Sequence, residues 1–213
     1  MGHLLDLISS KTLYLPYIHR WEDPYENILR HALKFTDRGV ATFGRLTHGM
    51  CALCFSEPPE CAAMWRIYGT PAVKEPTADD LSVRVEFCLG TLLDQIWHHV
   101  GAEHAKTTVW AGRLTYLDEA ALRQQVSDLV DATDGTPGTA LLDPTNRRIA
   151  ETLFLKRRAF AFEREVRILV DPRFHDADSR TDGDESIGVR VPLLILPRES
   201  GHPDRSREAP EGR

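Results

Sequence analysis

The stretch KRRAFAFEREVRILV, residues 156–170, decides how the fold of this chain is interpreted. If residues 162–170 form a β-strand, successive side chains point to opposite faces of a sheet. The apolar side chains of this strand then share one face, and Glu163, Glu165 and Arg167 share the other. The pattern therefore predicts a strand with one core-facing side and one charged side.

Composition sets the class of protein to which this strand belongs. The chain has 213 residues, of which 42% are hydrophobic and 27% charged, as expected of a globular domain that needs neither disulfides nor metals to fold. A net charge of -6 argues against a generally basic surface for nucleic acid. No apolar run is long enough to span a bilayer, and the start lacks the features of a signal peptide. We therefore expect a cytoplasmic protein with no membrane partner.

Helical and strand periodicities interleave irregularly along the chain, and this favours an α+β class. The expected fold is a mixed, mainly antiparallel sheet of about five or six strands with interleaved helices. It occupies a single domain, residues 1–196, followed by a polar tail, residues 197–213, that we expect to be disordered. The expected strands are 11–18, 48–56, 81–87, 107–117, 162–170 and 187–196. The expected helices are 3–8, 24–35, 58–69, 89–100, 118–133 and 143–160, and charged or glycine-rich loops are expected at 133–139 and 175–186.

Cysteine and histidine patterns give little support to a metal site. Cys51 and Cys54 form a C-x-x-C pair, but no second pair follows at zinc-ligand spacing. Side chains three positions apart on a strand also point to opposite faces. We expect buried, reduced thiols, and we expect the histidines near the end of the helix at 89–100 to be solvated; these are His98, His99 and His104.

Four segments in order resemble the bacterial domain of unknown function family 2971. They are LYLPYIHRWEDPYENIL, CFS followed by MWRIYG, VWAGRLTYL and FLKRRAFAFEREVRILV, and the resemblance covers residues 4–196. Members of that family usually begin with one more strand, which carries an aromatic–Arg pair. The resemblance therefore predicts either that the true start lies upstream of Met1 or that this strand is lost.

The layout of that family is similar to that of ADP-ribosyltransferases, and this likeness implies a site. Ser56 would end the middle strand, and Glu163 and Glu165 would supply an E-x-E motif. The likeness implies NAD as a substrate, with Glu165 as the carboxylate that stabilises an oxocarbenium-like transition state and Glu163 as the group that addresses the acceptor. Arg167 and Lys156 are candidates for binding the pyrophosphate.

Two further segments are candidates for the walls of this site. Trp65, Arg66 and Tyr68 would line a base- or nicotinamide-stacking pocket, or this helix packs into the core and Arg66 pairs with a late glutamate. Asp23 and Glu26 would hold a loop over the site, although a helix cap already explains Asp23.

Two functions follow from these expectations. The first is an NAD-using effector, a toxin or phage-defence protein with a macromolecular acceptor and no firmly expected cofactor. The second is a catalytically inactive binding or regulatory module of the same fold. A solvated strand face is the structural alternative for the charged residues of the opening stretch.

Overall fold

The computed structural model describes residues 7, 9–36, 39–57, 61–69, 84–103, 108–131, 145–171 and 188–193, and within them the fold is α+β. The expected loops at 133–139 and 175–186 and the tail lie outside the described residues, as does most of the segment at 3–8. No helix of the described part is long and apolar enough to cross a membrane.

The helices and strands of the described residues are mostly short. The strands are β1 Thr12–Pro16, β2 Leu33–Thr36, β3 Gly39–Thr42, β4 Cys51–Ser56, β5 Thr108–Arg113, β6 Thr115–Leu117, β7 Leu155–Arg157, β8 Glu165–Asp171 and β9 Gly188–Pro192. The α-helices are α2 Ala62–Met64, α3 Leu89–Glu103, α4 Glu119–Asp131 and α5 Arg147–Thr152. The 3₁₀ helices are η1 Ile18–Arg20, η2 Ile28–His31, η3 Gly44–Thr47 and η6 Arg158–Glu163, and η4 Trp65–Gly69 is a π-helix.

The strands form four small sheets in the described part of the chain, not one sheet of five or six strands. The central sheet has the antiparallel order β4-β8-β5, and β1 pairs with β9 and β2 with β3, also antiparallel. β6 pairs with β7 in parallel. The expected single strand at 107–117 is divided at Leu114. The backbone N–H of Leu114 donates to the carbonyl oxygen of Glu165, and the next N–H, that of Thr115, donates to the carbonyl oxygen of Phe154.

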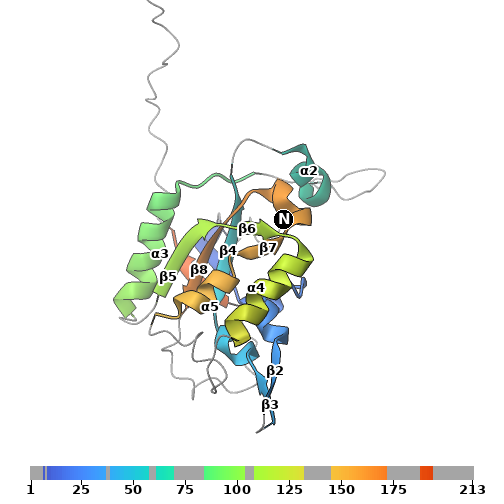
Figure 1. Ribbon diagram of the computed structural model, residues 1–213. Coiled ribbons are helices and arrows are strands. Elements are labelled where there is room, and N and C mark those ends of the chain that lie inside the picture. The colour runs from blue at the N-terminus through green and yellow to red at the C-terminus, as the bar shows by residue number, and fades with distance from the viewer. Residues whose placement is uncertain are drawn as a thin grey trace, which may run out of the picture.

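Strand β8 lies between two apolar clusters, so both of its faces are buried. Ile168 and Val170 pack into the cluster that includes Ile96 of α3, while Leu169 packs into the cluster that includes Leu122 of α4. Figure 1 shows α3 and α4 on opposite sides of the strands. The predicted alternation along β8 is confirmed, and the structural alternative of a solvated charged face is excluded, since a helical layer covers that face too.

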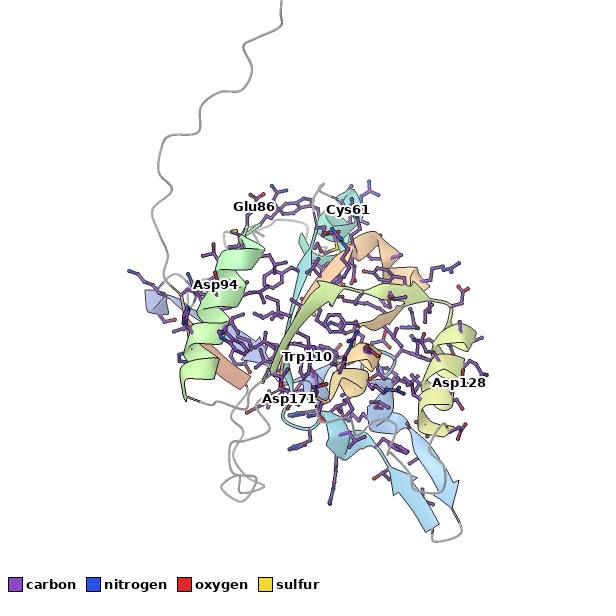
Figure 2. The ribbon with its side chains drawn as sticks, turned by 60° about the vertical axis from the view of Figure 1, so that its left-hand side comes forward. Cys61, Glu86, Asp94, Trp110, Asp128 and Asp171 are labelled. Atoms are coloured by element: carbon purple, nitrogen blue, oxygen red, sulfur yellow. The ribbon has the colours of Figure 1, made fainter. Side chains whose placement is uncertain are left out.

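Figure 2 shows the same layering with side chains. Asp94 on α3 and Asp128 on α4 lie at opposite outer sides, and side chains fill the space between the two helices. Both aspartates are exposed, so they mark the solvent faces of the two amphipathic helices. The helices expected at 89–100 and 118–133 are confirmed as α3 and α4.

Three other expectations about elements are wrong, and each has a local reason. The segment at 24–35 is not a helix, because the Asp23 side chain accepts the N–H of Tyr25 at 3.0 Å in a turn, and the chain then continues into η2 and β2. Residues 84–88 of the expected strand at 81–87 are irregular and mostly exposed. The expected helix at 143–160 divides into α5, β7 and η6.

Candidate functional site

The two glutamates of the opening stretch are held by two different elements. η6 ends at Glu163, and β8 begins at Glu165. Arg164 between them has a left-handed backbone with φ 46°, a conformation that costs a non-glycine residue roughly 1 kcal/mol. This turn directs both carboxylates toward the same lysine, whereas two residues on a regular strand would stand side by side.

That lysine is Lys156 of β7, and it is 6% exposed. Its Nζ donates to Glu163 Oε2 at 2.6 Å and to Glu165 Oε2 at 2.8 Å. It also lies 2.7 Å from Glu26 Oε1, and the Phe160 ring stands 5.1 Å from the ammonium. Three carboxylates therefore share one buried cation, and Glu26, which was expected to hold a loop over the site, contributes one of them.

Arg167 is the second cation of the cluster and is fully buried. Its Nε donates to Glu165 Oε1 at 2.9 Å, and its Nη2 lies 2.7 Å from the same oxygen without the alignment of a hydrogen bond. Its Nη1 donates to the carbonyl oxygen of Leu153, and its guanidinium lies 4.2 Å from the centre of the Trp21 ring. Because a buried charge without partners is very costly, these contacts are what allow an arginine in the interior.

These five charged residues define what we call the charge network: Glu26, Lys156, Glu163, Glu165 and Arg167. Three carboxylates face two cations, so the network carries one excess negative charge when all five groups are ionised. Glu163 is 5% exposed and Glu165 is 4% exposed. Neither carboxylate is open to a ligand in this conformation.

The protonation states of the network follow from its geometry. Burial acts to raise the pKa of Glu165, but Arg167 outweighs it, aided by Cys54 and Lys156, and the pKa is lowered below its usual range. Burial acts to lower the pKa of Lys156, but its hydrogen bonds to three glutamates outweigh that and raise it. Both groups are therefore held in their charged forms at neutral pH.

Three neighbours lie at the edge of the network. The Tyr68 hydroxyl donates to Glu163 Oε1 at 2.7 Å, and burial together with this bond raises the pKa of Tyr68 to about 12. The Tyr116 hydroxyl accepts the backbone N–H of Glu165 at 2.8 Å. Cys54 of β4 lies beside Glu165, and the pKa of its thiol is raised to about 12, first by burial and then by the neighbouring carboxylate.

The structure brings most of the expected site residues together. Glu163, Glu165, Arg167 and Lys156 meet directly, and Tyr68 joins them. Ser56 lies opposite Glu165 in the β4–β8 register and is exposed. Glu163 and Glu165 do not line an open surface, because Lys156, Arg167 and Tyr68 lie against their carboxylates.

The helix around Trp65 departs from the expected packing into the core. Arg66 is exposed, and among the described residues no ion pair joins it to either late glutamate, since Tyr68 and Lys156 occupy them instead. Trp65, Ile67 and Tyr68 are 37%, 57% and 60% exposed, so the prediction that this helix packs into the core is wrong. The π-helical turn of η4 is the physical reason, because it shifts these side chains away from α-helical positions.

Sequence reasoning did not anticipate three members of the site: Trp21, Tyr116 and Cys54. Tyr116 and Trp21 lie in the segments that carry the family resemblance, which was the available signal. Cys51 is buried and Cys54 exposed, so the expected opposite orientation of the pair is confirmed, but the expectation that all the thiols are buried is wrong. In the described part of the chain, no group of His, Cys, Asp or Glu side chains is placed to hold a metal ion.

Comparisons with protein-family models, with curated proteins and with solved structures found no match to this chain.

Proposed function

We propose that this chain is a binding or regulatory module in which the E-x-E segment has a structural role. The observation that carries the proposal is the burial of both glutamates against Lys156, at 2.6 and 2.8 Å, with about a twentieth of each residue exposed. A carboxylate that stabilises a cationic sugar must be in direct contact with that sugar, so it cannot already be bound to another cation. Here Lys156 and Arg167 occupy that position.

The network connects segments that are far apart in the sequence. Glu26 comes from the turn before η2, Lys156 from β7, Glu163 from η6 and Arg167 from β8. Removing one member of a buried ion pair typically costs about 3–5 kcal/mol, because the remaining charge is left without a partner. The network therefore fixes the relative positions of these segments and favours one arrangement of the surface above them.

The test combines two measurements on the wild type and on Glu165→Gln. Titration calorimetry and nicotinamide release report NAD binding and cleavage, and urea unfolding reports stability. The proposal expects neither binding nor cleavage of NAD by either form, and a clear loss of stability in the variant. Nicotinamide release by the wild type, abolished in an equally stable Glu165→Gln variant, would refute the proposal.

The second candidate is an NAD-using, ADP-ribosyltransferase-like effector, and the excess negative charge of the network favours it. A developing positive charge on a ribose would balance that excess. Tyr68 is exposed and bonded to Glu163, so movement of η4 would open a route from the surface to this carboxylate. If this candidate is correct, Glu163→Gln impairs transfer to an acceptor more than it impairs hydrolysis of NAD, and Glu165→Gln suppresses both.

A further inference from the structure

A second group of charged residues lies on the short 3₁₀ helices and contrasts with the charge network. The rings of His19 and His48 stack with centroids 5.8 Å apart and an angle of 8° between their planes, and Tyr17 stacks on His19 at 5.4 Å. Arg30 of η2 donates from Nη1 to the carbonyl oxygen of His19. Arg20 follows His19 directly at the end of η1. We call His19, Arg20, Arg30 and His48 the basic group.

The surroundings of His19 are positive. Burial, and then the charges of His48, Arg20 and Arg30, lower the pKa of His19, and each of these three neighbours is basic. Glu22 is the nearest carboxylate in the sequence, but among the described residues no ion pair joins it to Arg20 or Arg30. The group therefore holds cationic side chains together without the carboxylates that usually offset them.

Six other exposed or half-exposed arginines of the described residues have carboxylate partners, whereas Arg45, Arg66 and Arg164 form no such ion pair. Each of the following pairs lies within 3.4 Å or less: Arg84–Glu86, Arg113–Glu57, Arg123–Glu119, Arg147–Glu151, Arg157–Asp23 and Arg158–Asp118. In a chain of net charge -6, carboxylates are abundant. Within the described part of the chain, Arg20 and Arg30 also lack a carboxylate partner, and both lie beside the imidazole of His19, which stacks on that of His48. This combination of unpaired guanidiniums and stacked imidazoles needs a physical reason.

A buried atom of the group also lacks a hydrogen bond. His19 Nδ1 is shielded from solvent and has no hydrogen-bond partner in the structure. Buried polar atoms are nearly always satisfied, by the protein, by ordered water or by a bound ion. Arg20, Arg30 and His48 are themselves exposed, so a ligand reaches them without any rearrangement of the core.

We propose that the basic group binds the phosphate chain of a small oligophosphate, such as inorganic tripolyphosphate or a nucleoside triphosphate. Guanidinium groups bind phosphate oxygens through paired, charge-assisted hydrogen bonds, and an imidazole N–H adds another donor. A ligand with several linked phosphates matches a site with two separate guanidiniums and the N–H groups of two imidazoles. The overall negative charge of the chain disfavours an extended polyanion such as nucleic acid, whose charges reach beyond the group. This inference gives a ligand to the binding module proposed above and depends on that proposal for its functional meaning.

The test is titration calorimetry of the full chain with tripolyphosphate, with ATP and with a single-stranded oligonucleotide, at near-physiological salt. Removing one charge-assisted phosphate contact should weaken binding by about tenfold or more. We expect that loss in Arg20→Gln and in Arg30→Gln, and a larger loss in the double variant. Arg147→Gln is the matched control, because it removes an exposed arginine from α5, outside the basic group, and should leave the affinity unchanged. Thermal melting of each variant verifies that it is folded.

The two phosphate ligands distinguish the source of the phosphate chain. Equal affinity for tripolyphosphate and ATP assigns the site to the phosphate chain alone, and tighter binding of ATP assigns it to a nucleotide; both support the proposal. Absence of binding at about 1 mM of either ligand would overturn it, since that corresponds to less than roughly 4 kcal/mol of binding free energy. Equal weakening by Arg147→Gln, or tighter binding of the oligonucleotide, would also overturn it. These outcomes leave the stability and NAD tests of Glu165→Gln unaffected, so the two proposals fail separately.

Discussion

The charge network and the basic group are both clusters of ionisable residues, but they differ in how their charges are matched. In the interior, three glutamates converge on Lys156 and Arg167, and each cation has carboxylate oxygens at hydrogen-bond distance. At the surface, Arg20 and Arg30 stand beside two histidines with no carboxylate paired to them among the described residues. The comparison teaches that buried charges with close partners of opposite sign stabilise a fold, whereas exposed charges without such partners are available to a ligand.

The largest expected effect comes from removing the shared cation of the interior. Lys156→Met keeps most of the side-chain volume but leaves three carboxylates without their ammonium. We expect the free energy of unfolding in urea to fall by about 3–5 kcal/mol, the usual effect of breaking a buried ion pair.

Arg113→Met is the control for this experiment. Arg113 pairs with Glu57 at 2.6 Å, but its side chain is mostly exposed, and such pairs contribute at most about 1 kcal/mol. If Lys156→Met changes stability as little as Arg113→Met does, the interior and surface charges are equivalent and the comparison above is wrong.

A smaller effect is expected at the edge of the network. Tyr68→Phe removes only the hydroxyl that donates to Glu163, so it should lower the free energy of unfolding by about 1–2 kcal/mol. Ile67→Ala, on the same π-helix, removes an exposed side chain and should change stability by less than about 0.5 kcal/mol. Chemical denaturation of both variants decides this. A larger loss of stability in Ile67→Ala than in Tyr68→Phe would mean that η4 packs into the core.

The smallest expected effect concerns pH. Because the pKa of Glu165 is lower in the folded state than in the unfolded state, its ionisation stabilises the fold above the unfolded-state pKa. That contribution is lost as the pH falls through the folded-state pKa. We therefore expect the stability of the wild type to fall more steeply on acidification below about pH 5 than that of Glu165→Gln. If the free energy of unfolding in urea has the same pH dependence in the wild type and in Glu165→Gln, the lowered pKa of Glu165 is contradicted.

Part of this fold follows from the sequence alone. The apolar and charged alternation of β8 and the amphipathic patterns of α3 and α4 are local signals, and the structure confirms them. The contact between Glu165 and Arg167 also follows from the sequence, since both lie on one face of β8. Glu163 was expected on the same strand, but it ends η6 and is joined to Glu165 through Lys156.

Other features depend on tertiary contacts that no local pattern contains. Whether the charged face of β8 is exposed to solvent or buried depends on α4 and α5, which pack over it. Two further members of the charge network, Lys156 and Glu26, lie in other segments: Lys156 in β7, and Glu26 in the turn that begins at Asp23. Tyr68 replaces Arg66 as the partner of Glu163 because η4 is a π-helix, and nothing in the sequence WRIYG distinguishes that turn from an α-helical one.

The most direct test of the structural role of the network is the free energy of unfolding of Glu165→Gln relative to the wild type, measured in urea near neutral pH. Glutamine keeps the shape of the side chain and removes the charge that Lys156 and Arg167 require. A structural network predicts a loss of about 3 kcal/mol or more, as for other broken buried ion pairs. Catalytic residues are often placed at the expense of stability, so their replacement often leaves a protein as stable as before or more so. An unchanged or increased stability of Glu165→Gln would therefore contradict the account and favour the carboxylate as a catalytic group.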